Sequence, residues 1–174
     1  KTGLAVIAST FLLAAPIAQA DGHVKPAVVY DTAGKNDKSF NEAVFNGITR
    51  FMNDTGIAVT ELEPTNEAMM EQSLKKFAQC GYSPVVAVGF TMANAVAAAA
   101  AEYPDTQFTI IDGVVDAPNV QNVIYKEHEG SFLVGVMAAM ASNSGTVGFV
   151  GGMDIPLISR FECGYKQGVA HADR

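Results

Sequence analysis

The residues of this sequence that are best suited to binding chemistry come directly after apolar runs that are typical of buried strands. Asp31 and Asp112 each follow such a run, and Phe90 follows a third run after a single glycine. In open α/β sheets ligands bind beyond the carboxyl ends of the strands, so we expect these side chains on one rim. Two carboxylates there suit the hydroxyl groups of a sugar, although each one alone equally suits a helix cap or a tie within its own loop. Phe90 is equally suited to packing and to stacking.

The segment 31–41 joins the first of these strands to a helix and holds two further candidates. Phe40 falls in the first helical turn, where an aromatic ring can stack on a ligand, but it also fits the apolar stripe of the helix. Asn41 offers an amide to the edge of a heterocycle, or it is a solvated helix residue. Asp37 and Ser39 are assigned to the start of the helix rather than to a ligand.

The remaining polar residues do not indicate an enzyme. The histidines are scattered, no nucleophile is placed with a base, and Cys80 and Cys163 lack the spacing of metal ligands. Gly148–Gly152 matches neither a dinucleotide-binding nor a phosphate-binding loop. We therefore predict binding without catalytic residues, metal or cofactor. The two cysteines are expected to be small buried residues, and a disulfide between them stays open.

Strand-like and helix-like segments alternate along the chain, which predicts a parallel sheet with helices on both faces. Ser39 and Glu42 have the spacing of a capping box at the first helix. The expected strands are 28–30, 58–60, 85–88, 108–111, 123–125 and 147–150. The expected helices are 39–53, 66–79, 91–102, 129–141 and one that opens at Pro156.

Residues 1–20 have the features of a secretory signal peptide rather than of a folded element. Leu4–Ile17 is almost wholly apolar but too short to span a bilayer, and Ala18-Gln19-Ala20 is a small-x-small cleavage site. The sequence begins without Met and stops within a helical pattern, so we expect a fragment. Without Lys1 the chain has 10 basic and 18 acidic residues, a net charge of −8, which disfavours nucleic acid as a partner.

Several motifs follow one another along the sequence after the leader. Their combination is more specific than any one of them. They are Asp31-x-x-Gly34-x-x-Asp37-Lys38-Ser39-Phe40-Asn41, Gly89-Phe90, Ala101-Glu102-Tyr103-Pro104-Asp105-x-x-Phe108-x-x-Ile111-Asp112, Glu129-Gly130-Ser131-Phe132-Leu133-x-Gly135, Val147–Gly152 and Phe161-x-x-Gly164-Tyr165-x-x-Gly168. This combination resembles the basic membrane protein (BMP) family of ABC-transporter substrate-binding proteins, which includes the PnrA-type purine-nucleoside receptors. Ala33 departs from the second glycine that is usual in the family's first motif.

The resemblance implies a type I periplasmic-binding-protein-like lobe whose second lobe is truncated. It divides the chain into a signal peptide at 1–20, an N-terminal ligand-binding lobe at 21–150, and a crossover with the start of the second lobe at 151–174. By resemblance, Asp31 and Asp112 hold a ribose, Phe40 stacks on a base, and Asn41 bonds the edge of that base. The implied partners are a small-molecule ligand, with a nucleoside favoured, and an ABC permease in the inner membrane. The implied compartment is the periplasm, after cleavage behind Ala20.

Three alternatives stay open at this point. One is a periplasmic sensor that presents its ligand to a membrane signalling partner. Another is a family member for a solute that is not a nucleoside. The third is an exported α/β hydrolase, which the lack of a nucleophile–base pair disfavours.

Overall fold

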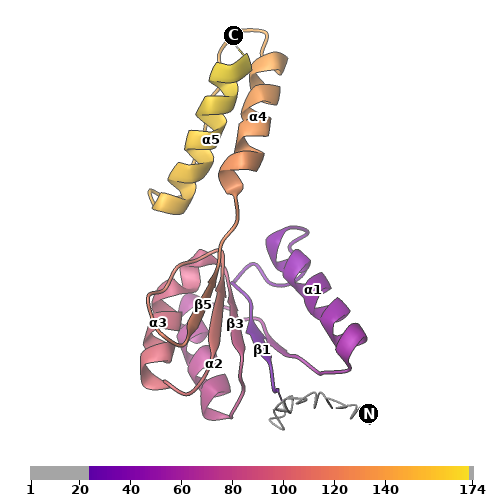
Figure 1. Cartoon of the computed structure of the whole chain (residues 1–174), viewed down its shortest axis with the longest axis vertical. Helices are drawn as coiled ribbons and strands as arrows, with labels where there is room; N and C mark the ends of the chain where they lie inside the picture. Colours follow the sequence, from indigo (N-terminus) through magenta and orange to yellow (C-terminus); the bar gives the residue numbers. More distant parts are fainter. Residues whose placement is uncertain (1–23, 173–174) are drawn as a thin grey trace, which may run out of the picture.

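The computed structural model describes residues 24–172, and its centre is a five-stranded, all-parallel sheet (Figure 1). The strand order is β2-β1-β3-β4-β5, so the chain starts near the middle of the sheet and builds outward in both directions. The strands are β1 (Ala27–Val29), β2 (Thr60–Leu62), β3 (Val85–Val88), β4 (Phe108–Ile111) and β5 (Val120–Val123). The signal peptide expected at 1–20 lies outside the described residues.

Helices cover both faces of this sheet, which confirms the predicted α/β class (Figure 1). The strands alternate their side chains between two apolar clusters, because successive residues of a strand point to opposite faces. Ala27 and Val29 face α2 and α3, whereas Val28 and Tyr30 face α1. The helices are α1 (Phe40–Thr55), α2 (Glu67–Gln79), the 3-10 turn η1 (Phe90–Met92), α3 (Ala93–Glu102), α4 (Glu127–Ala141) and α5 (Pro156–Ala172).

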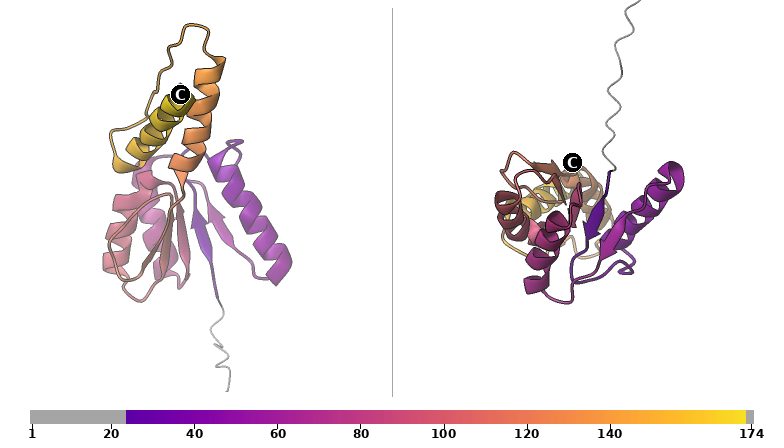
Figure 2. Two further views of the ribbon diagram at one scale, coloured as in Figure 1. Left: turned by 45° about the horizontal axis from the view of Figure 1, so that its top comes forward. Right: turned by 90° about the horizontal axis from the view of Figure 1, so that it is seen from below.

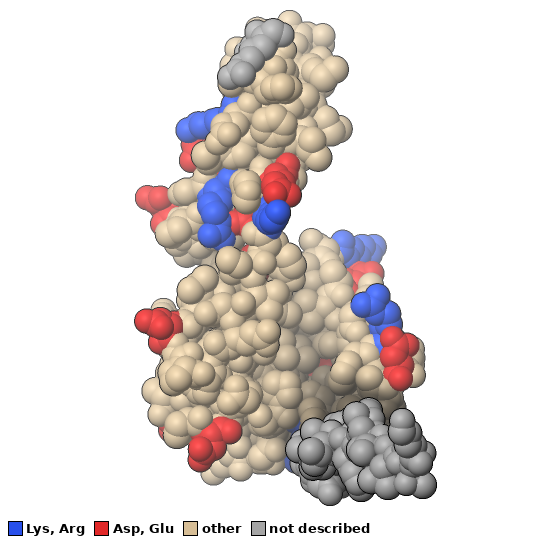
Figure 3. Space-filling view, in the orientation of Figure 1, with Lys and Arg blue, Asp and Glu red and all other residues tan. Residues whose placement is uncertain are grey.

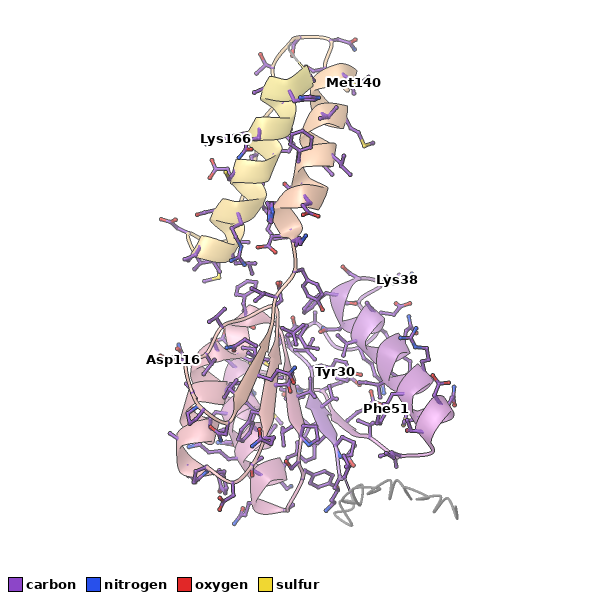
Figure 4. The ribbon with its side chains drawn as sticks, viewed as in Figure 1. Tyr30, Lys38, Phe51, Asp116, Met140 and Lys166 are labelled. Atoms are coloured by element: carbon purple, nitrogen blue, oxygen red, sulfur yellow. The ribbon has the colours of Figure 1, made fainter. Side chains whose placement is uncertain are left out.

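The two faces are covered to different extents. Leu74 of α2 and Val96 of α3 are fully buried against the sheet. On the other face α1 leaves an apolar groove, and Phe51 near the end of this helix is 39% exposed (Figure 4). The sheet is therefore tightly packed on the α2–α3 side and open on the α1 side.

The helices α4 and α5 form a hairpin that extends beyond the carboxyl ends of the strands (Figures 1 and 2). They pack closely because glycines lie where the two backbones meet. A Cβ atom on Gly135 would overlap the backbone of Tyr165, and one on Gly168 would overlap the backbone of Phe132. The outer side of α4 is apolar and exposed, as at Met140, which is 78% exposed (Figure 4).

The domain division expected at residue 150 stays a prediction, and the structure shows how the helices after the sheet pack. The chain leaves the sheet after β5, and α4 packs on α5 rather than on the sheet. The spatial separation therefore falls at residues 124–126. Glycines on both helices let α4 and α5 pack against each other. The apolar pattern of a single helix does not show which helix it packs against.

The structure corrects several of the predicted strands, including the second, which lies at Thr60–Leu62 instead of 58–60. Residues 147–150 are not a strand, and Val150 is 97% exposed. A strand needs a neighbouring strand for its backbone hydrogen bonds, and the described part of the hairpin offers none. The fifth strand lies at Val120–Val123 instead of 123–125, because its exposed residues Gln121 and Asn122 interrupt the apolar pattern of a sheet-edge strand.

The expected burial of the cysteines is wrong. Cys80 ends α2 and Cys163 lies on α5, and both thiols are free and exposed. A helical position alone does not say which way a side chain faces. Within residues 24–172 no helix is long and apolar enough to cross a membrane.

Candidate ligand-binding site

The loop between β1 and α1 is organised by Asp37, which caps the helix. Its Oδ1 atom accepts hydrogen bonds from the backbone N–H groups of Ser39 (2.8 Å) and Glu42 (3.1 Å), and its Oδ2 atom accepts one from Asn41 N (3.1 Å). Partial desolvation raises the pKa of Asp37, but these N–H donors outweigh it and hold the pKa below its usual value. The assignment of Asp37 to the helix start is confirmed. The capping box is wrong, because the Ser39 side chain makes no capping bond.

Asp31 and Asn41 form a direct pair at the base of this loop. Asn41 is fully buried, and its Nδ2 atom donates to Asp31 Oδ1 (2.6 Å) and to the carbonyl oxygen of Gly34 (3.0 Å). Asp31 Oδ1 also accepts from Ala33 N (2.8 Å). The hydrogen bonds that this carboxylate makes to described residues all go to Oδ1, so Oδ2 is free for another donor. Asn41 is therefore not a solvated helix residue, because its amide nitrogen is bonded within the loop.

Gly89, at the end of β3, brings Asp31 and Phe40 to one point. A Cβ atom at Gly89 would lie 3.6 Å from Asp31 Oδ2 and 3.8 Å from Cε1 of Phe40. Gly89 has a φ of +103°, a conformation that side-chain-bearing residues rarely adopt. The free oxygen of the carboxylate and the edge of the ring therefore face the same small region beyond the end of β3.

Asp112 and Phe90 form the neighbouring part of the rim. Asp112 follows β4 with a φ of +61°, and a Cβ at the next residue, Gly113, would lie 3.4 Å from Cα of Phe90. Burial raises the pKa of Asp112, the negative charge of Glu127 raises it further, and Arg160 lowers it. This carboxylate thus lies where the sheet, η1 and the hairpin meet.

Two cavities adjoin these residues, and Asp112 lines both. The first, of about 730 Å³, lies between α1 and the sheet and is lined by Phe40, Asp112 and mainly apolar side chains. The second, of about 430 Å³, lies between the strand ends and the start of α5, and its lining includes Phe90, Asn94, Asp112 and Arg160. Asp31 and Asn41 line neither cavity. The structure therefore brings Asp31 and Phe40 together beside Gly89, with Asn41 bonded to Asp31, and it places Phe90 close to Asp112 and Gly113.

Sequence reasoning missed the residues that the hairpin brings to this rim. Glu127, at the start of α4, is buried, and Nε of Arg160 on α5 donates to its Oε1 atom. Its Oε2 atom is also buried and finds no hydrogen-bond partner in the described part of the chain. Charged side chains of both signs gather at this end of the hairpin (Figure 3). No signal within the sequence pairs Glu127 with a residue 33 positions away.

Among the described residues, no group of three or more His, Cys, Asp or Glu side chains is placed to hold a metal ion. The arrangement offers carboxylates, an aromatic ring and apolar walls, which suit reversible binding of a small polar molecule.

Comparison with known proteins identifies the family. The model of the Bmp family, described as ABC transporter substrate-binding protein PnrA-like, matches residues 24–174. The chain belongs to this family. The family is one of substrate-binding proteins, which agrees with the prediction of binding rather than catalysis. The match also supports the resemblance drawn from the motifs at Asp31–Asn41 and Gly89-Phe90.

Individual members of the family match most of this chain in sequence. The chain is 33% identical over 150 residues to the ABC transporter nucleoside-binding protein BmpA of Lactococcus lactis, covering 83% of this chain and 43% of that protein. It is 27% identical over 143 residues to basic membrane protein A of Borreliella burgdorferi, covering 80% and 42%. The chain therefore spans less than half the length of these relatives.

A solved structure confirms the fold. An ABC-transporter solute-binding protein from Aeropyrum pernix superposes with a TM-score of 0.76 at 31% identity, over 86% of this chain and 44% of that one. The periplasmic-binding-protein-like class is thus confirmed for the described region.

Proposed function

We propose that the protein is an exported receptor of an ABC importer and that it binds a purine nucleoside or a related nucleobase–sugar ligand. The observation that carries this proposal is the convergence of Asp31 Oδ2 and the Phe40 ring beside Gly89, with Asp112 at the neighbouring strand end. A carboxylate oxygen to which no described residue donates can accept hydrogen bonds from sugar hydroxyls, and a half-exposed ring can stack on a base. The nucleoside-binding relative from Lactococcus lactis supports this ligand class.

Each rim residue has a role in the proposal. Asp31 and Asp112 hold the sugar, Phe40 stacks on the base, and Phe90 forms part of the wall of the second cavity. Asn41 holds Asp31 through Nδ2, and its Oδ1 atom, which has no partner within residues 24–172, is the atom through which it would meet the edge of the base.

The proposal includes a second lobe and a membrane partner. Residues up to 125 form the sheet lobe, and the α4–α5 hairpin is the first part of the opposite lobe, whose remaining parts cover the exposed apolar side of α4. Ligand is held between the lobes, which close by a hinge motion. Export follows cleavage behind Ala20, and the loaded receptor delivers its ligand to an ABC permease in the inner membrane.

Isothermal titration calorimetry with adenosine and guanosine tests the site on the full-length protein. Asp31→Ala removes a charge-assisted hydrogen bond and Phe40→Ala removes a stacking surface, so each should weaken binding about tenfold or more. Asp116→Ala, in an exposed loop, is the matched control that should bind normally (Figure 4).

Unchanged affinity in both site variants would remove the site assignment. If the wild-type protein bound a different solute through the same residues, the site assignment would stand and the proposed ligand class would be wrong.

A further inference from the structure

Two carboxylates at the end of β2 contact the loop between β1 and α1 and the residue that precedes it. Glu61 lies within β2, and Glu63 follows the strand directly. Neither carboxylate lines either of the two cavities. Their contacts instead go to Tyr30, Gly34 and Lys35, which precede or form the first part of the loop.

Glu61 holds the residue from which the loop departs. The hydroxyl of Tyr30, whose side chain is fully buried, donates to Glu61 Oε2 at 2.5 Å. Burial raises the pKa of Tyr30 and the bond to Glu61 raises it further, so this hydroxyl stays a donor at neutral pH. Lys35 Nζ lies 3.7 Å from Glu61 Oε1, which gives the same carboxylate a second contact within the loop.

Glu63 holds the turn itself. Its Oε2 atom accepts a hydrogen bond from Lys35 N at 2.9 Å. The same oxygen lies 2.9 Å from the point that a Cβ atom on Gly34 would occupy, and Gly34 has a φ of +73°. The turn therefore needs glycine both for its conformation and to leave room for this carboxylate.

Gly34 connects Glu63 to the ligand-binding residues. Its carbonyl oxygen accepts from Asn41 Nδ2, and its N–H donates to the carbonyl oxygen of Asp31 at 3.2 Å. Asn41 in turn bonds the Asp31 carboxylate. A continuous path of hydrogen bonds and backbone contacts thus runs from Glu63 through the turn to the Asp31 carboxylate, whose other oxygen faces Gly89.

We propose that Glu61 and Glu63 form a clamp that fixes the loop in its binding conformation before ligand arrives, so that both are positioning residues for Asp31. The inference rests on the proposed function for its link to affinity. A loop that is already ordered loses less conformational freedom on binding, so the clamp raises affinity without contacting the ligand. Because Glu63 is exposed and outside the core, its removal should leave the fold intact.

The test measures loop order and affinity separately on the full-length protein. Glu63→Ala should speed hydrogen–deuterium exchange at the Lys35 amide about tenfold in the ligand-free protein, which is the loss expected for a bond to a charged group. Glu63→Gln retains an acceptor oxygen and should restore most of the protection. Glu71→Ala is the matched control, because Glu71 pairs with Lys75 on α2, away from the loop. It should change neither exchange at Lys35 nor binding.

Calorimetry with adenosine and guanosine provides the second readout. Glu63→Ala should weaken binding several-fold while urea unfolding stays close to wild type, and Glu63→Gln should bind nearly normally. Unchanged exchange at Lys35 would overturn the clamp, whatever the ligand. Faster exchange with unchanged affinity would overturn its role in binding. If wild-type protein bound neither nucleoside, the proposed ligand would fail, and the exchange result would still support or overturn the clamp.

Discussion

Replacement of Asn41 by Ala should destabilise the sheet lobe, because this buried amide joins the loop to β1. The change removes a hydrogen bond to the Asp31 carboxylate, worth about 1.5–3 kcal/mol, and one to the Gly34 carbonyl, worth about 1 kcal/mol. It also removes the buried Oδ1 atom that has no partner in the described chain, which returns about 1 kcal/mol. The free energy of unfolding should therefore fall by about 1.5 to 3 kcal/mol.

Urea unfolding followed by circular dichroism measures this loss. With a denaturant slope of about 2 kcal/mol per molar urea, the midpoint should fall by about 1 M. Asn46→Ala is the matched control, because Asn46 lies exposed on the same helix. Alanine is the better helix former, so that variant should be unchanged or slightly more stable.

Asn41→Asp adds a pH-dependent test of the same contact. It places a second carboxylate against Asp31, so one of the two should keep its proton and have a raised pKa in the folded state. The variant should therefore lose stability as the pH rises above the ordinary aspartate range, and recover it in acid. An Asn41→Ala protein within about 0.5 kcal/mol of wild type would refute the structural role given to this amide.

Three other features give predictions that do not depend on the ligand. Asp112→Asn should raise stability at neutral pH, because burial and then Glu127 raise the pKa of Asp112 in the folded state. The gain in stability should vanish as the pH falls below 3.8, the usual pKa of aspartate. Urea unfolding at a series of pH values measures this change. Gly168→Ala should destabilise the α4–α5 hairpin, because its Cβ would overlap Phe132, whereas Gly130→Ala, with open space around it, should be neutral or stabilising in thermal unfolding. Asn119→Asp should cost about 3 kcal/mol or more in urea unfolding, because the buried amide donates to three backbone carbonyls and a carboxylate has no donor.

The sheet was predictable from sequence wherever its strands are buried on both faces. Val85–Val88 and Phe108–Ile111 lie where the apolar runs placed them, because central parallel strands are apolar throughout. The edge strand β2 was expected at 58–60, two residues early, and the structure places Glu61 within the strand, where its carboxylate accepts a hydrogen bond from Tyr30. The sequence analysis did not predict the contacts that Glu61 and Glu63 make with the loop.

The site was predictable as a set of strand ends but not as a set of contacts. Asp31 and Asp112 follow parallel strands. They lie at the same edge of the sheet because the carboxyl ends of parallel strands meet there. The burial of Asn41 depends on how the loop folds back on Gly34, which the helix pattern does not contain. The Glu127–Arg160 pair depends on the packing of α4 on α5, and close approach at Gly164 and Gly168 becomes visible only in three dimensions.

The most direct test of the central claim is mass spectrometry of the small molecules released when the purified full-length protein is denatured. The account predicts a purine nucleoside in near-stoichiometric amount from wild-type protein and a strongly reduced amount from Asp31→Ala. Release of a solute with neither a sugar nor an aromatic base, or equal nucleoside from both proteins, would contradict it.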